Sequence, residues 1–137
     1  MSVPIPPILE LLKKDRRYTL EAYQFVREAL DYAHRALGMG AGKPIRPGEE
    51  PPPEAHLTGQ QLCEAIRQYA IDQFGYLAKT VLNSWGVRST SDFGEIVYNL
   101  IDINEMRKSE TDRREDFDDV YDFDEVFVHQ FKIQIPE

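Results

Sequence analysis

The sequence has one cysteine, comparatively few basic residues and no long apolar run. A single cysteine, Cys63, excludes an internal disulfide, and we expect a reducing, cytoplasmic location. The apolar runs are far shorter than the roughly 20 residues that a membrane-spanning helix needs. The charges near the N-terminus follow the apolar stretch, which is the wrong order for a secretory signal. We therefore expect no membrane association.

The sequence also lacks the short motifs that are typical of catalysis. It has no glycine-rich phosphate loop, no nucleophile elbow and no paired-histidine zinc motif. Zinc-ligand spacing is absent among the residues that could bind this metal, which are His34, His56, His129 and Cys63. Pairs of acids that could exchange a proton arise by chance in so acidic a chain. We expect no catalytic residue, metal or cofactor, and an enzyme is only the third functional hypothesis.

A chain of 137 residues with 42% hydrophobic composition is long enough for one core of ordinary size. Residues 38–56 are rich in glycine and proline and have almost no apolar periodicity, which predicts a flexible connector. The predicted organisation is a single domain over 1–137 with this connector and an acidic, aromatic C-terminal segment at 115–137.

The net charge of −8 is concentrated in that last segment. Residues 115–137 contain eight acids and one base, Lys132, which leaves about −1 for the rest of the chain. Such a chain has no general attraction for phosphate backbones or anionic lipids. The expected partner is therefore another protein, and nucleic acid is less expected.

Apolar residues recur at steps of three and four in five segments, which predicts five helices. Thr19 is placed to cap the second helix, and Thr58 with Gln61 fits a capping box at the start of the third. Gly75 and Gly86 are placed to end the third and fourth helices. The predicted helices cover about 6–14, 20–37, 58–74, 76–85 and 89–101.

Beyond Asn104 the helical period fades. A polar stretch lies between flanks that could pair as a β-hairpin, and Tyr121 and Phe123 alternate with acids as in a strand. A helical turn around Asp124–Val128 is an equal alternative. The predicted fold class is α+β, mainly α, with about five helices and a small C-terminal β-hairpin.

The last two predicted helices and the hairpin have the element order of a winged helix. The second helix of that fold enters the DNA major groove. Its outward positions here include Asp92, Glu95 and Asp102, where DNA-binding proteins normally have arginine, lysine or neutral polar residues. A winged-helix-like nucleic-acid-binding protein is thus the alternative function. Its candidate phosphate contacts are Arg88, Arg107, Lys108, Arg113 and Arg114.

The segment Glu115–Phe127 interleaves acids with aromatic residues and lacks the glycine that a calcium loop requires. Its rings could anchor it to the core while the carboxylates face water. Alternatively, exposed rings beside the acids could form a docking surface for a basic partner. The predicted partner contacts are Asp118, Asp119, Tyr121, Asp122 and Phe123, with the basic cluster Lys13, Lys14, Arg16 and Arg17. The opposite charges of these two groups could also pair two copies of the chain.

Four stretches together resemble a family of small uncharacterised bacterial proteins. They read "RRYTLEAYQFVREALDYA", "LTGQQLCEAIRQYAIDQFG", "NSWGVRSTSDFGEIVYNLID" and "REDFDDVYDFDEVF". The resemblance implies a bacterial cytoplasmic protein and carries no substrate, cofactor or catalytic residue. The functional prediction is a noncatalytic protein-interaction or regulatory module.

Overall fold

The computed structural model describes residues 6–37, 57–107 and 112–129. These residues form five α-helices, as the periodicity predicts, and three short helical segments. The α-helices are α1 (Pro7–Lys14), α2 (Leu20–Arg35), α3 (Gly59–Phe74), α4 (Ala78–Ser84) and α5 (Thr90–Asp102). The short segments are the 3₁₀ helices η2 (Gly75–Leu77) and η3 (Arg114–Phe117) and the π-helix η4 (Glu125–His129). None of the described helices is long and apolar enough to cross a membrane.

Local sequence signals fix the ends of several helices. The predicted capping box of α3 is present, since Gln61 N donates to Thr58 Oγ1 (3.1 Å) and Thr58 N donates to Gln61 Oε1 (2.9 Å). Gly75 then ends α3 with a positive φ of 54°. Thr19 is the N-cap residue of α2 as predicted, but its side chain makes no capping hydrogen bond. The backbone and the packing of α2 therefore fix this helix start.

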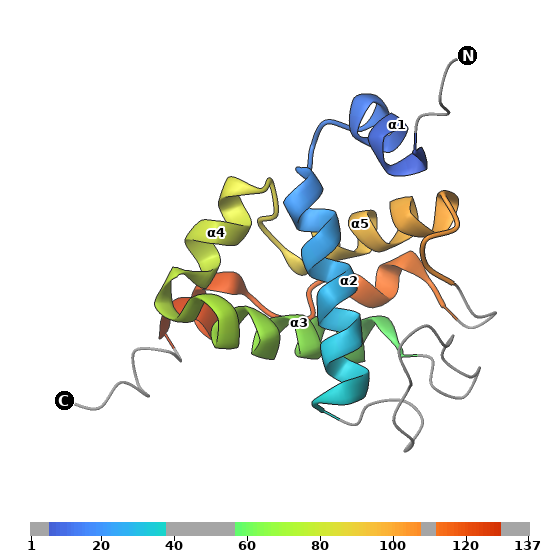
Figure 1. The fold of residues 1–137 in the computed structure, drawn as a ribbon. Coiled ribbons are helices and arrows are strands. Elements are labelled where there is room, and N and C mark those ends of the chain that lie inside the picture. The colour runs from blue at the N-terminus through green and yellow to red at the C-terminus, as the bar shows by residue number, and fades with distance from the viewer. Residues whose placement is uncertain (1–5, 38–56, 108–111, 130–137) are drawn as a thin grey trace, which may run out of the picture.

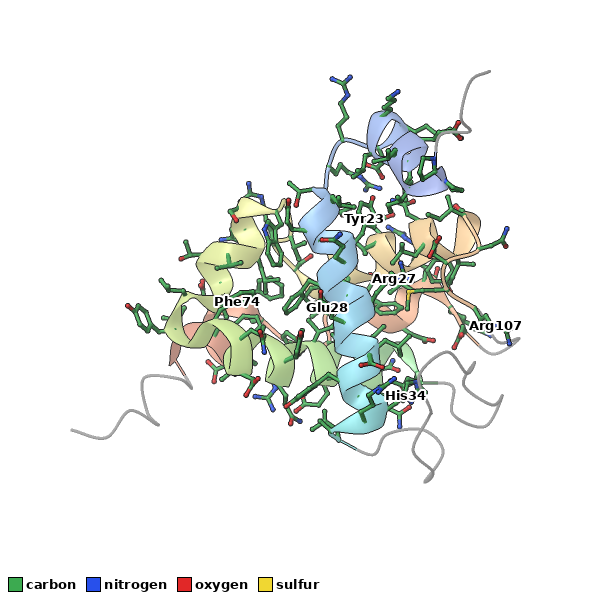
Figure 2. The ribbon with its side chains drawn as sticks, in the orientation of Figure 1. Tyr23, Arg27, Glu28, His34, Phe74 and Arg107 are labelled. Atoms are coloured by element: carbon green, nitrogen blue, oxygen red, sulfur yellow. The ribbon has the colours of Figure 1, made fainter. Side chains whose placement is uncertain are left out.

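The core lies where α2 packs across α3 and α5, while α1 stands outside this group of helices (Figure 1). An aromatic cluster joins three of the helices: the ring of Phe25 lies 5.5 Å from Phe74 and 5.4 Å from Trp85 between centroids. Polar contacts on α2 add to this packing (Figure 2). Arg27 pairs with Glu105 beyond α5 (3.1 Å), and Glu28 accepts a hydrogen bond from the Tyr69 hydroxyl (3.0 Å).

The predicted β-hairpin and α+β class are wrong. The described residues contain no strand, and the described part of the expected hairpin consists of turns and the 3₁₀ helix η3. The alternative helical turn is confirmed by η4. Without a β wing, the winged-helix interpretation also fails. The connector at 38–56, Lys108 and the stretch at 130–137 lie outside the described residues.

The alternation of aromatic and acidic residues in the acidic segment does not come from a β-strand. Phe117, Phe123 and Phe127 are buried, with 5%, 5% and 1% of their surfaces exposed. The Phe117 ring lies against two glycines, since a Cβ built on Gly59 or Gly94 would come within about 3 Å of Phe117 atoms. The rings are buried from short helical segments and the residues that join them, and the exposed acids Asp118, Asp119 and Asp122 lie between Phe117 and Phe123.

Candidate interaction site

The acids of the C-terminal segment form an exposed acidic platform, which we define as Glu115, Asp118, Asp119 and Asp122. Buried rings lie beneath it: Phe123 is in the core, and the half-buried Tyr121 donates its hydroxyl hydrogen to the Cys63 carbonyl (2.8 Å). The anchoring role predicted for the rings is confirmed. The predicted docking role of Tyr121 and Phe123 needed an exposed ring, and neither residue supplies one.

Hydrogen bonds or backbone geometry fix three of the four platform acids. Asp118 Oδ1 accepts from Ser91 Oγ on α5 (2.8 Å), and Asp122 Oδ1 accepts from the backbone of Glu125 (3.1 Å) at the start of η4. Asp119 has a φ of 50°, a left-handed conformation that aspartate tolerates better than most residues. The carboxylates of Asp118 and Asp122 are therefore held by hydrogen bonds, and Asp119 is fixed through its backbone.

One stripe of α5 connects the platform with the N-terminal part of the chain. Ser91, Glu95, Asn99 and Asp102 are spaced by four, four and three residues, which places them on the same side of the helix. Ser91 binds the platform at one end. In the winged-helix alternative this stripe would have faced DNA, but residues of the linker between α1 and α2 contact Glu95 and Asn99 at its centre.

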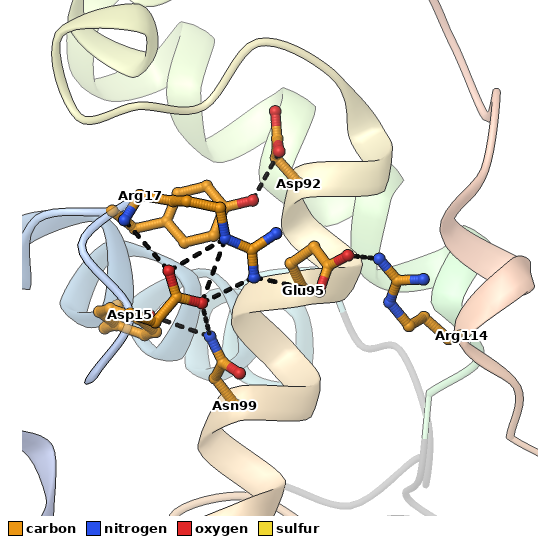
Figure 3. A network of polar contacts seen from close by, with 8 residues as sticks. Asp15, Arg17, Asp92, Glu95, Asn99 and Arg114 are labelled. Carbon is orange, nitrogen blue, oxygen red and sulfur yellow. Dashed lines mark hydrogen bonds and ion pairs between the residues drawn. The ribbon is translucent and has the colours of Figure 1, made fainter. Parts of the chain in front are cut away.

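Arg17 in that linker is the centre of the polar network in Figure 3. Its Nη2 lies 2.6 Å from Asp15 Oδ2 and 3.4 Å from Glu95 Oε2. Arg114 of η3 pairs with the other oxygen of Glu95. Glu95 therefore binds arginines from two segments that are distant in sequence, one on each side of α5 in the chain.

Asp15 is held in its charged form by the same network. The Arg17 side chain, which donates to it, holds the pKa of Asp15 well below its usual range, and Asn99 Nδ2 adds a hydrogen bond of 3.0 Å. Asn99 Nδ2 also donates to the Tyr23 hydroxyl (3.1 Å). Both hydrogens of the Asn99 amide are therefore used.

The stability contributed by Asp15 should depend on pH. Because its pKa is lowered on folding, the stabilisation is complete above the unfolded pKa of about 3.9 and is lost as the pH falls further, toward the folded pKa. Asp15→Asn should therefore destabilise the protein at about pH 6 by more than at about pH 3. Urea unfolding at both pH values measures this difference. An equal loss at both would show that the charge of Asp15 does not stabilise the fold.

The predicted basic cluster divides into two groups. Arg17 belongs to the polar network, whereas Lys13, Lys14 and Arg16 are exposed and have no described ion-pair or hydrogen-bond partner on their side chains. Three of the four basic residues that were predicted to contact a partner are thus exposed at the end of α1 and just after it.

The arginines proposed to contact nucleic acid are not gathered in one place. Arg88 precedes α5 and Arg107 follows it, so the helix, about 20 Å long, separates them. Arg113 is the N-cap residue before η3, and Arg114 is paired with Glu95. These positions form no continuous basic surface along α5.

A groove of about 430 Å³ lies between α1 and the end of α5. Leu11 and Ile103 contribute apolar surface, and Glu10 and Asp102 contribute carboxylates from the two helices. Sequence reasoning missed this site because its walls are almost ninety residues apart in the chain. The polar stripe of α5 was the available signal, but it was weighed only as the outer face of a DNA-recognition helix, where its acids counted against DNA binding.

The described residues offer little for metal or thiol chemistry. They contain no group of three histidine, cysteine or acidic residues that could hold a metal ion. Cys63 is fully buried, and burial raises the pKa of its thiol to about 12. The thiolate that a nucleophilic cysteine needs is therefore disfavoured.

No family model, curated protein or solved structure matches this chain. The support for a function therefore comes from the chemistry of the described residues.

Proposed function

We propose that the protein is a noncatalytic interaction module that binds a basic surface of another protein through its acidic platform. The observation that carries the proposal is the placement of exposed carboxylates over buried rings. Hydrogen bonds already hold the Asp118 and Asp122 carboxylates in place, so binding has fewer side chains to order, and the entropy cost is reduced. A fixed negative surface also increases the rate at which a basic partner associates.

The charge of the platform can be removed without removing its hydrogen bonds. Glutamine and asparagine keep a carbonyl oxygen as acceptor, and asparagine tolerates the left-handed backbone of Asp119. The test variant, called the platform variant below, is Glu115→Gln/Asp119→Asn/Asp122→Asn. The control is Glu21→Gln/Asp31→Asn/Asp72→Asn, which removes the same number of charges from exposed positions on α2 and α3.

We expect nuclease-treated cell extract to yield a basic protein that wild type and control retain equally. The platform variant should retain it at least about tenfold less, because close charge pairs across an interface have coupling energies above 1 kcal/mol. Quantitative pull-down at two salt concentrations measures both the loss and its salt dependence. Equal retention by the platform variant, or recovery that nuclease abolishes, would contradict the proposal.

A further inference from the structure

The groove between α1 and α5 presents hydrogen-bond acceptors without described partners. Glu10 and Asp102 make no described hydrogen bond or ion pair, and no described hydrogen bond reaches Asn99 Oδ1, while the Asn99 amide hydrogens go to Asp15 and Tyr23. Asp15 also lines the groove, but its two oxygens accept from Arg17 and Asn99. The groups open to a ligand are thus two exposed carboxylates and one amide oxygen, which together favour a hydrogen-bond donor, above all a cationic one.

The apolar part of the groove restricts the form of that cation. Leu11 and Ile103 lie among the lining residues, beside the acceptors. A side chain with an aliphatic stem and a charged head can cover such apolar surface while its head meets the carboxylates. A guanidinium carries five donors in a planar fork, so it can donate to both helices at once, whereas an ammonium is a compact charge.

We infer that this groove binds an arginine side chain of the basic partner, with its guanidinium between Glu10 and Asp102 and its stem against Leu11 and Ile103. The inference rests on the proposed function and adds a specific contact to it. The groove and the platform lie along the same stripe of α5, since Ser91 binds Asp118 and Asp102 lines the groove. These two positions are about 16 Å apart along the helix, a span that about five extended residues can cover.

Lys14 also lines the groove and is the one cation among its lining residues. It has no described partner, so its ammonium opposes the approach of another cation. Removing its charge should strengthen arginine binding, whereas removing the charge of Glu10 or Asp102 should weaken it. A merely structural role of these residues would not give opposite effects of this kind.

The experiment is a titration of the full chain with N-acetylarginine amide, followed by amide chemical shifts in NMR spectra. We expect a dissociation constant in the millimolar range, with shifts at Leu11, Ile103 and the Asn99 side chain. Glu10→Gln/Asp102→Asn should weaken binding about tenfold, and Lys14→Gln should tighten it about twofold. The platform variant should bind the probe as wild type does.

Two matched probes test the assignment of the ligand. N-acetylcitrulline amide has nearly the same shape without the charge and should cause no saturable shift. N-acetyllysine amide should bind more weakly, and equal binding would overturn the guanidinium assignment. Shifts outside the groove, or unchanged binding in Glu10→Gln/Asp102→Asn, would overturn the inference as a whole.

The inference and the proposed function can fail separately. If the probe does not bind the groove but the platform variant still loses its protein partner, the inference is wrong and the proposed function stands. If the probe binds but partner retention does not depend on the platform, the proposed function is wrong. Loss of the partner by Glu10→Gln/Asp102→Asn as well would support both.

Discussion

Replacing Gly86 with alanine should destabilise the protein by at least about 3 kcal/mol, or prevent folding altogether. Gly86 has a φ of 92°, which L-residues rarely adopt, and an added Cβ would lie 2.0 Å from the backbone oxygen of Arg17. The two backbone segments cannot separate freely, because Thr19 N donates to the Trp85 carbonyl next to Gly86 (3.2 Å). The strain therefore adds to a forced displacement of the linker that holds Arg17.

Urea unfolding followed by circular dichroism measures the effect on the free energy of unfolding. Gly75→Ala is the control, since Gly75 also has a positive φ (54°) and reports the cost of that backbone conformation. We expect this control to lose about 1–3 kcal/mol, and Gly86→Ala to lose more because of the close approach to Arg17. If both variants lost the same amount, the close approach to Arg17 would contribute nothing.

Phe117→Ala should destabilise the protein by about 3–5 kcal/mol, the usual cost of removing a buried phenylalanine ring. The ring is 5% exposed and packs against Gly59 and Gly94, so at these two positions the helices have no side chain beside the cavity. Collapse of the backbone around the cavity would also pull on the platform acids that follow Phe117 in the chain.

The same unfolding measurement tests this prediction, with Leu9→Ala as control. Leu9 lies on α1 and is 42% exposed, so its truncation should cost less than about 1 kcal/mol. Phe117→Leu should fall between the two because it refills part of the space. A loss near zero for Phe117→Ala would contradict the placement of this ring in the core.

The helices were predictable because their signals are local. The capping box at Thr58 and the glycine at position 75 act within a few residues, and the apolar spacing repeats over whole segments. The C-terminal segment was not predictable in this way. Its alternation of rings and acids matches a strand, yet it arises from the left-handed Asp119, the capping Asp122 and a ring that fits between glycines contributed by α3 and α5.

The candidate site was also predictable only in part. The excess of acids after residue 115 is visible in the composition, so the platform could be located. The groove depends on the docking of α1 against α5, and no periodicity reveals a contact between segments so far apart. The role of Arg17 was missed for the same reason, since its partner Glu95 is separated from it by seventy-eight positions.

The burial of Phe117, Phe123 and Phe127 also affects how the chain can fold during synthesis. The ribosome makes all five α-helices before it makes the residues that fill the space between α3 and α5. A nascent chain that has released only the helices still exposes the apolar surface that these rings cover, so it cannot complete its core until η4 has emerged. Chaperones that bind exposed apolar segments would therefore compete with the last three phenylalanines of the core for the same surface.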